Sequence, residues 1–251
     1  MKNKCDIIWL DSVDSTNNEA KRRISSCDNM TVLSALSQTS GRGQRGNTWS
    51  SSPGENLTFS IILKDIGHIP AVSQSALSEI TALSVTELLA QYDIHAMIKW
   101  PNDIYVAERK ICGILIENSL RGNHLSSSII GIGLNINQRN FDVKLPNPTS
   151  IVLESQSECS FNTKICLEKF MDIFQGHLDA FSGSEEDFNR LRQLYLSRLW
   201  RKNEQHRYID QKENREFLGV IRGLTKAGSL IIENEKGESK EFAFKEISYI
   251  L

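Results

Sequence analysis

Residues 96–135 read AMIKWPNDIYVAERKICGILIENSLRGNHLSSSIIGIGLN, and this stretch decides the fold. It contains short β-rich runs at 96–100, 104–106, 111–117 and 127–135. The segments between them are turn-forming: Pro-Asn-Asp, Glu-Arg-Lys and Arg-Gly-Asn. Short runs joined by such turns predict consecutive antiparallel hairpins, so neighbours in the sequence should be neighbours in one sheet.

Further strands and helices are predicted on both sides of this stretch. Residues 31–38 and 57–63 are β-rich and predict two more strands. From 71 to 91, apolar residues recur at helical spacing, which indicates an amphipathic helix packed on the sheet. Near the N-terminus, Thr16 and Glu19 fit a capping box at the start of a helix. Helices are also predicted at 163–181 and 185–202.

The C-terminal part of the chain has a different character. Alternating runs at 217–221, 229–233 and 240–244 are punctuated by Lys-Ala-Gly and Glu-Lys-Gly. Short strands of this kind favour a small β-barrel. We therefore predict an α+β protein with a first domain at 1–203 and a second at 204–251.

Composition excludes several classes of protein. The chain has 251 residues with 29 Lys plus Arg, 31 Asp plus Glu and a net charge of −2, which argues against a general polyanion binder. Its five cysteines form no C-x-x-C motif and its histidines are widely spaced, so we expect reduced thiols and no built-in zinc site. The apolar run at 7–10 is too short for a signal sequence or a membrane span, which favours a cytoplasmic protein.

A glycine-rich loop follows the strand predicted at 31–38. Residues 41–46 read GRGQRG and match G-x-G-x-x-G, but the Ser- and Pro-containing segment 47–54 cannot start a long helix. A dinucleotide-binding motif needs that helix, and no Gly-Lys-Ser/Thr follows to make a P-loop. What remains is either a solvated surface loop or a loop whose backbone amides and arginines bind carboxylate or phosphate.

The turn after residue 100 is a second candidate site. Pro101 holds Trp100 extended and ends its strand, which places Asn102 and Asp103 at the turn. Their oxygens suit a ligand or Mg²⁺, although these residues taken alone favour a plain Asx turn. Lys110 begins the next strand, where it either serves the site or simply extends to solvent.

These motifs occur together in one order. They comprise Ser15-Thr16-Asn17, residues 38–49 (QTSGRGQRGNTW), residues 99–103 (KWPND), residues 109–113 (RKICG) and residues 131–135 (GIGLN). In order and spacing the chain resembles the biotin–protein ligases, also called biotin–[acetyl-CoA-carboxylase] ligases. The resemblance extends over nearly the whole chain, including the C-terminal β module.

The resemblance implies a fold and an activity. The fold is a catalytic domain related to class II aminoacyl-tRNA synthetases and lipoate ligases, with a mixed sheet flanked by helices, followed by an SH3-like barrel. The activity is ATP-dependent formation of biotinyl-5′-AMP with release of pyrophosphate, followed by transfer of biotin to a lysine of a biotin carboxyl carrier domain. ATP, Mg²⁺ and biotin are the implied ligands. Neither DNA nor a membrane is an expected partner, and a homodimer is left open.

The resemblance also assigns roles to residues. Ser15, Thr16 and Gln38, with the backbone near Gly41, match positions that contact the biotin ring, and Arg42 and Lys110 match positions facing the biotin carboxylate and the α-phosphate of ATP. Asn102 and Asp103 match positions near the phosphates and the metal, whose ligands the sequence does not identify. We expect Arg42, Lys110 and Asp103 to be catalytic. The remaining predicted binding residues are Asn17, Gly43, Gln44, Trp49, Gly113, Gly131, Gly133 and Asn135.

One position departs from the family pattern. Gln44 stands where the best-studied bacterial relative has arginine, so one positive charge of the loop is missing. Two other functions compete with biotin ligation. A lipoate–protein ligase would have a purely apolar ring pocket, which the polar Ser15, Thr16 and Gln38 disfavour. A non-enzymatic biotin sensor would not need the phosphate-facing cations Arg42 and Lys110.

Overall fold

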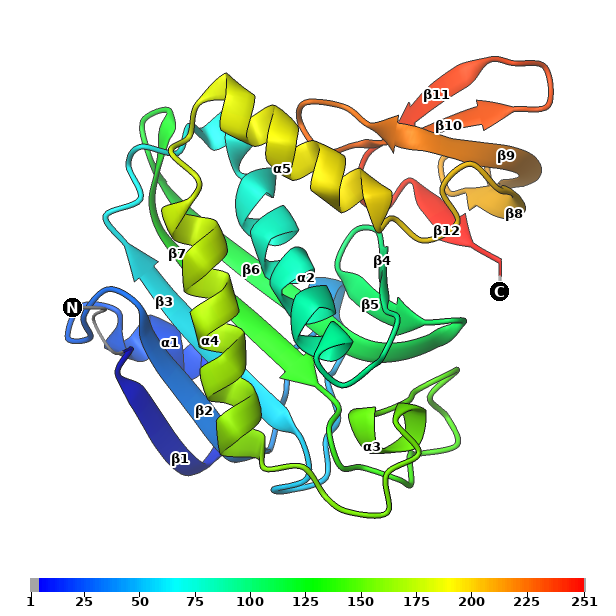
Figure 1. Cartoon of the computed structure of the whole chain (residues 1–251). Helices are drawn as coiled ribbons and strands as arrows, with labels where there is room; N and C mark the ends of the chain where they lie inside the picture. Colours follow the sequence, from blue (N-terminus) through cyan, green and yellow to red (C-terminus); the bar gives the residue numbers. More distant parts are fainter. Residues whose placement is uncertain (1–4, 251) are drawn as a thin grey trace.

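The computed structural model describes residues 5–250, apart from the side chain of Arg45. One seven-stranded sheet has the order β1-β2-β3-β7-β6-β5-β4 (Figure 1). β1 and β2 are parallel, and every other neighbouring pair is antiparallel. The strands are β1 Ile7–Val13, β2 Thr31–Gln38, β3 Leu57–Lys64, β4 Met97–Lys99, β5 Asp103–Val106, β6 Arg109–Arg121 and β7 His124–Leu134. The predicted chain of hairpins from β4 to β7 is confirmed.

Helices cover both faces of this sheet. α2 and α4 lie on one face with α5 beside them, whereas α1 lies on the opposite face (Figure 1). The helices are α1 Thr16–Arg23, α2 Ser75–Ala90, α3 Ile151–Glu154, α4 Thr163–Asp179 and α5 Glu185–Ser197. Short 3₁₀ turns occur at η1 Gln44–Gly46 and η2 Ala71–Ser73. The mixed sheet flanked by helices agrees with the predicted fold class.

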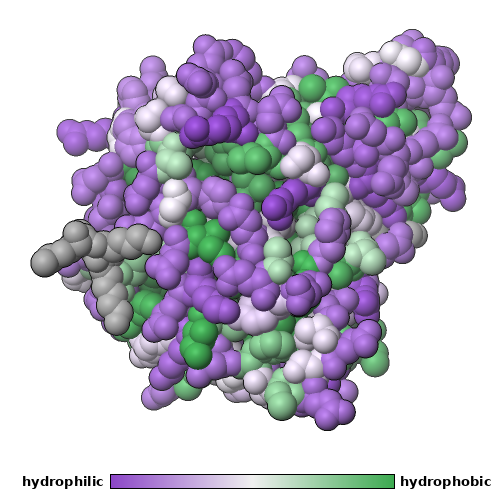
Figure 2. Space-filling model, in the orientation of Figure 1, coloured by the Kyte–Doolittle hydropathy of each residue, from purple (hydrophilic) through white to green (hydrophobic). Residues whose placement is uncertain are grey.

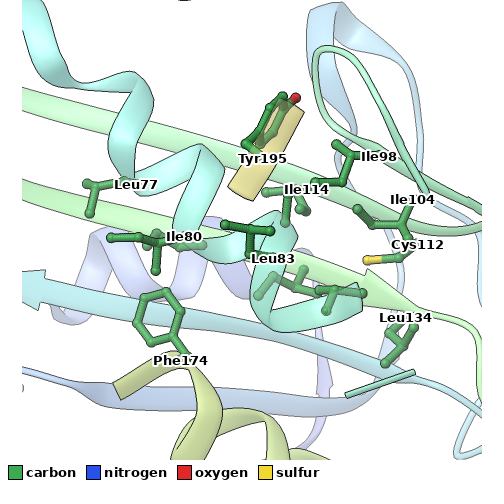
Figure 3. Close-up of a cluster of buried hydrophobic side chains, with 14 of the residues drawn as sticks. Leu77, Ile80, Leu83, Ile98, Ile104, Cys112, Ile114, Leu134, Phe174 and Tyr195 are labelled. Carbon is green, nitrogen blue, oxygen red and sulfur yellow. The ribbon is translucent and has the colours of Figure 1, made fainter. Parts of the chain in front are cut away.

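The main core lies between the sheet and α2. Leu77, Ile80 and Leu83 of α2 lie over the strands, close to Ile114 and Leu134 (Figure 3). All five side chains are at most 2% exposed. Burying an aliphatic side chain of this size contributes roughly 1.5–3 kcal/mol, so this face supplies the rigid support for the strands.

The alternation of side chains along β7 separates the core from the other face of the sheet. Ile130 and Ile132 belong to the main core, whereas Ile129 joins a smaller cluster with Ala20 of α1. Because successive side chains of a strand point to opposite faces, Gly131 and Gly133 fall on the α1 face. Glycines at these positions let other side chains approach the backbone of that face closely.

The C-terminal strands form a separate antiparallel sheet in the order β11-β10-β9-β8-β12. They are β8 Gln205–Asp210, β9 Arg215–Leu224, β10 Leu230–Asn234, β11 Ser239–Phe242 and β12 Ile247–Tyr249. Trp100 Nε1 donates to Gly228 O at 2.9 Å, and the Arg192 guanidinium donates to Thr225 O. The short strands predicted for the C-terminal part are thus present as a five-stranded antiparallel sheet, which is hydrogen-bonded to the rest of the protein.

The start of α1 differs from the prediction. The predicted capping box is wrong: Ser15 occupies the N-cap position, Thr16 is the first helical residue, and Glu19 pairs with Arg22 and Arg23 instead.

The domain boundary at 203/204 stays a prediction. It falls between α5 and β8, but the hydrophobic core continues across it to residues such as Tyr208.

The side of the protein that carries α2 and α4 is mostly hydrophilic at its surface. Hydrophobic residues show there in small groups between polar ones (Figure 2). Across residues 5–250, no helix has both the length and the apolar character that crossing a membrane requires.

Candidate active site

A cavity of about 360 Å³ lies where the glycine-rich loop, the Pro101 turn, α1 and the open face of β6 and β7 meet. Nearly all of the predicted site residues line it. They are Ser15, Thr16, Asn17, Gln38, Arg42, Gly43, Gln44, Trp49, Asn102, Asp103, Lys110, Gly113, Gly131 and Gly133. Motifs that are more than a hundred residues apart in the sequence therefore converge on one cavity, as the sequence analysis expected.

One end of the cavity is a network of neutral polar groups. Gln38 Oε1 accepts from the backbone N–H of Thr16 at 2.8 Å and from its hydroxyl at 3.2 Å. The hydroxyl of Ser60 lies 2.8 Å from that of Thr16 and 2.6 Å from Asn17 Oδ1. Ser15, Thr16, Asn17 and Ser60 are all buried. Because these groups orient one another, the network is a rigid surface suited to a ligand with amide-like donors and acceptors.

Glycines form the floor of the cavity because other groups occupy the space above them. A Cβ at Gly133 would lie 2.2 Å from Cε2 of Trp49, and one at Gly131 would lie 2.1 Å from Oδ1 of Asn17. At Gly113 the nearest ring atom of Trp49 would be 3.0 Å away. The indole therefore rests directly on the backbone of β6 and β7 and forms one wall of the cavity.

The other end of the cavity is positively charged. Lys110 Nζ lies 2.7 Å from Asp103 Oδ1 and 5.6 Å from the centroid of the Trp49 ring. Asn102 Nδ2 donates to Ile114 O at 3.0 Å, which fixes the turn that carries Asp103. In this arrangement an ammonium and a carboxylate neutralise each other in the lining of the cavity.

Lys99 is a second cation at this end. Its Nζ donates to Tyr105 Oη at 2.9 Å and lies 4.5 Å from that ring's centroid and 5.1 Å from that of Tyr249. Burial lowers the pKa of Lys99 and nearby Lys110 lowers it further, while the Asp103 carboxylate acts in the opposite direction. Tyr249 belongs to β12, so the C-terminal sheet helps to hold a cation of the cavity in place.

Arg42 does not join the other cations. Its guanidinium donates to both carboxylate oxygens of Glu117, each at 3.1 Å, and to Asn18 Oδ1 at 2.9 Å. The Arg42 guanidinium is therefore paired with Glu117, and its predicted role at the biotin carboxylate and the α-phosphate stays a prediction. Arg42 and Gly43 both line the cavity.

Two predicted binding residues lie just behind the cavity wall. A Cβ at Gly41 would lie 2.3 Å from the carbonyl oxygen of Trp49, so this glycine permits the loop to fold closely. Asn135 is 4% exposed, and its Nδ2 donates to Thr149 O at 2.8 Å. Both residues therefore support the cavity from outside its lining.

Sequence reasoning missed several residues of the site. Ser60 was a polar residue within an apolar strand, and Glu117 ended another, so an interrupted apolar run was the available signal. The C-terminal lining had no local signal, because only tertiary structure brings it to the cavity. Residues of the lining outside the predicted set include Asn47, Thr48, Lys99, Trp100, Phe244, Lys245, Ile247, Ser248 and Tyr249.

Comparison with known proteins agrees with this architecture. Residues 9–135 match the model of the biotin/lipoate A/B protein ligase family. The bifunctional ligase/repressor BirA of Salmonella typhimurium is 29% identical over 245 residues, which cover 95% of this chain and 72% of that protein. A biotin–[acetyl-CoA-carboxylase] ligase of Paracoccus denitrificans is 28% identical, with 91% of this chain and 94% of that protein covered.

A solved structure shows the same arrangement over the whole chain. The biotin protein ligase of Aquifex aeolicus in complex with biotin and ATP superposes with a TM-score of 0.79 at 29% identity, covering 97% of each chain. The fold and cavity thus place the protein in a class of ligases that share one catalytic domain. The chain belongs to the biotin/lipoate A/B protein ligase family, and the resemblance to biotin–protein ligases is confirmed.

Proposed function

We propose that this protein activates biotin with ATP as biotinyl-5′-AMP and then transfers biotin to a lysine of a biotin carboxyl carrier domain, as in acetyl-CoA carboxylase. The observation that carries the proposal is the division of one cavity into a neutral polar end at Thr16 and Gln38 and a cationic end at Lys99 and Lys110. Biotin has the same division, with a ureido ring at one end and a carboxylate at the other.

The polar end suits the ureido ring. That ring presents two N–H donors and one carbonyl acceptor, and leaving any of them unpaired in a buried site costs about 1–3 kcal/mol. The groups of Ser15, Thr16, Asn17 and Gln38 offer both donors and acceptors on one rigid surface. A purely apolar ring would offer no hydrogen-bond partner to this polar surface, which disfavours a lipoyl substrate.

The cationic end suits adenylation. The biotin carboxylate attacks the α-phosphorus of ATP, a new C(O)–O–P bond forms, and the bond to pyrophosphate breaks with its electron pair on the leaving group. Two anions must approach each other in this step, so nearby cations lower the barrier. Lys110 and Lys99 are placed to meet that charge, and Lys110 does so by leaving Asp103.

Mg²⁺ fits this end of the cavity by the chemistry of its donors. The ion prefers oxygen ligands and is commonly bound by one or two carboxylates together with substrate phosphates. Asp103 supplies one carboxylate there, and the Asn102 amide oxygen is adjacent in the sequence. When bound, the ion would neutralise phosphate charge.

In the second step the neutral amine of the acceptor lysine attacks the acyl carbon of biotinyl-AMP. The new amide bond forms, AMP leaves with the electrons of the C–O bond, and the amine loses its proton. We place this reaction in the cytoplasm. The relative named as a biotin–[acetyl-CoA-carboxylase] ligase supports this acceptor class.

The test is release of pyrophosphate from ATP with biotin or lipoate as the sole acceptor. We expect release that depends on biotin, followed by labelling of an added carrier domain. Release with lipoate alone would indicate a lipoate ligase. Tight biotin binding without release would indicate a sensor.

Gly133→Ala should disturb the cavity, because the new methyl group overlaps the Trp49 ring. Overpacking of this kind typically costs about 1–3 kcal/mol, and the displaced indole should also weaken biotin binding. Calorimetric titration and thermal unfolding measure the two effects. Gly176→Ala in α4 is the control for biotin affinity, since its added Cβ meets no atom within 4 Å outside its chain neighbours and its own helix backbone. Its stability should rise slightly, because alanine favours a helix over glycine by about 1 kcal/mol. Unchanged biotin affinity in Gly133→Ala would show that Trp49 is not a wall of the biotin pocket.

The loop at 39–48 should close more firmly when ligand binds. Three glycines within 41–46 make ordering costly, at about 1–2 kcal/mol per residue, and ligand contacts offset that cost. Trypsin cleaves after Arg42 and Arg45, so we expect rapid cleavage of the free protein that biotin plus ATP slows strongly. Equal cleavage rates with and without ligand would contradict a lid while leaving the ligase assignment intact.

A further inference from the structure

Glu117 stands at the junction of three elements around the cavity. Its carboxylate lies 2.7 Å from Lys21 Nζ of α1, accepts from Asn17 Nδ2 at 2.9 Å, and accepts both Arg42 hydrogen bonds from the glycine-rich loop. The Glu117 side chain is 22% exposed. Burial alone would raise its pKa, but the contacts with Lys21, Asn17 and Arg42 outweigh burial, so the pKa is lowered and the group is anionic at neutral pH.

The carboxylates that hold Arg42 and Lys110 lie at different points along β6. Arg42 is bound at Glu117, whereas Lys110 pairs with Asp103, and Lys110 precedes Glu117 on β6 by seven residues. The Lys110 side chain extends along its own strand, since its Cε lies 3.4 Å from the position of a Cβ at Gly113, which is opposite Asp103 and four residues before Glu117. An extended strand rises about 3.3 Å per residue, so the two anchoring points are about 13 Å apart along β6. With Arg42 held at Glu117, its guanidinium does not reach the cationic end of the cavity.

The contact with Glu117 instead restrains the loop. Arg42 is flanked by Gly41 and Gly43, whose flexibility would otherwise leave the backbone at the cavity rim undefined. The bidentate geometry fixes the orientation of the guanidinium as well as its distance. A second cation, Lys21, contacts the same carboxylate. When the loop opens, Glu117 therefore keeps a charged partner, which lowers the cost of releasing Arg42.

We propose that Glu117 is a positioning residue that latches the glycine-rich loop over the cavity through Arg42. The inference rests on the proposed function in one respect, namely that biotinyl-AMP is the ligand kept beneath the loop. Arg42 then slows loss of the intermediate rather than stabilising the charge that develops at phosphorus.

A double-mutant cycle tests the latch. Arg42→Gln, Glu117→Gln and the double variant are compared by amide hydrogen exchange of residues 39–49 in the free protein and by the dissociation rate of biotinyl-AMP. Glutamine at 117 keeps an oxygen for Asn17 while removing the charge that holds Arg42. We expect each single variant to speed both processes by about tenfold, as loss of a charge pair acts mainly on dissociation. The double variant should be no faster than either single variant.

Lys21→Gln is the matched control, because it removes the other cation on Glu117 and leaves the bond to Arg42. Its loop should exchange no faster than that of the wild type, because Glu117 then has no second cation to replace Arg42 when the loop opens. The latch is overturned if Glu117→Gln leaves loop exchange and dissociation unchanged, or if the effects of the two single variants add in the double variant. A large loss of pyrophosphate release in Arg42→Gln but not in Glu117→Gln would contradict the latch. It would indicate that Arg42 acts at the α-phosphate, as the sequence analysis predicts. Hydrogen exchange needs no substrate. It therefore tests whether Glu117 holds the loop through Arg42 even if the wild type makes no biotinyl-AMP.

Discussion

Lys110→Ala should slow pyrophosphate release from biotin and ATP by about 10²–10³-fold, while biotin still binds detectably. The Lys110 ammonium is at the cationic end of the cavity and is neutralised by Asp103 before ligand binds. Its charge matters most when carboxylate and α-phosphate approach each other, so the loss falls on the transition state rather than on biotin binding. Pyrophosphate release at saturating substrate, together with calorimetric titration of biotin, separates the two quantities.

Lys144→Ala is the control for Lys110, since Lys144 is an exposed lysine that does not line the cavity. It should release pyrophosphate at the wild-type rate. If Lys110→Ala retains more than about a third of that rate, its assigned part in transition-state stabilisation is wrong. Loss of biotin binding together with activity would point instead to a role in forming the cavity.

The strands and helices with clear periodicity were predictable from the sequence. The hairpins of β4–β7 follow from turn residues between short β-rich runs, and the presence of a helix at α2 follows from its apolar spacing. The predicted amphipathic character of α2 is wrong, because α4 and α5 pack against it as well as the sheet and bury it on most sides. β1 was missed because only Ile7 to Leu10 is apolar before Asp11 and Ser12 interrupt the pattern. The capping box failed because the Thr16 hydroxyl is engaged in the polar network with Gln38 and Ser60. A local pattern cannot reveal that a distant strand competes for the same hydroxyl.

Prediction of the site from the sequence is limited in the same way, because a local motif does not show which distant groups it contacts. Its motif residues were predictable because each motif lies near the end of a strand or helix, and the resemblance placed them together. The partner of Arg42 could not be predicted, because a guanidinium in a flexible loop can reach many carboxylates. Only the tertiary structure selects Glu117. Tyr249 was likewise unpredictable, because β12 reaches Lys99 only after the C-terminal sheet has folded against the catalytic part.

Asp103→Asn should slow transfer of biotin from preformed biotinyl-AMP by about 10²-fold. The acceptor lysine must lose a proton before it attacks, and Asp103 is the carboxylate of the motifs that lines the cavity. Its partner in the free protein is Lys110 at 2.7 Å. Once Lys110 turns to the phosphate, the Asp103 carboxylate is released to orient or deprotonate the incoming amine. Asparagine keeps the size of the side chain and removes the charge.

Single-turnover measurement of the two half-reactions distinguishes this role from the alternative. If Asp103 acts chiefly through the phosphates and the metal, Asp103→Asn will slow adenylation and leave transfer from added biotinyl-AMP at the wild-type rate, which would rule out the acceptor role. Glu108→Gln is the matched control: its carboxylate is 69% exposed, lies in the same hairpin and pairs with Arg201 rather than with a residue of the cavity. Both half-reactions should proceed normally in that variant. A defect in transfer that appears in Asp103→Asn and not in Glu108→Gln would therefore show that the Asp103 carboxylate acts on the acceptor lysine. In that reading Asp103 is free to do so because Lys110 has moved to the phosphate of ATP.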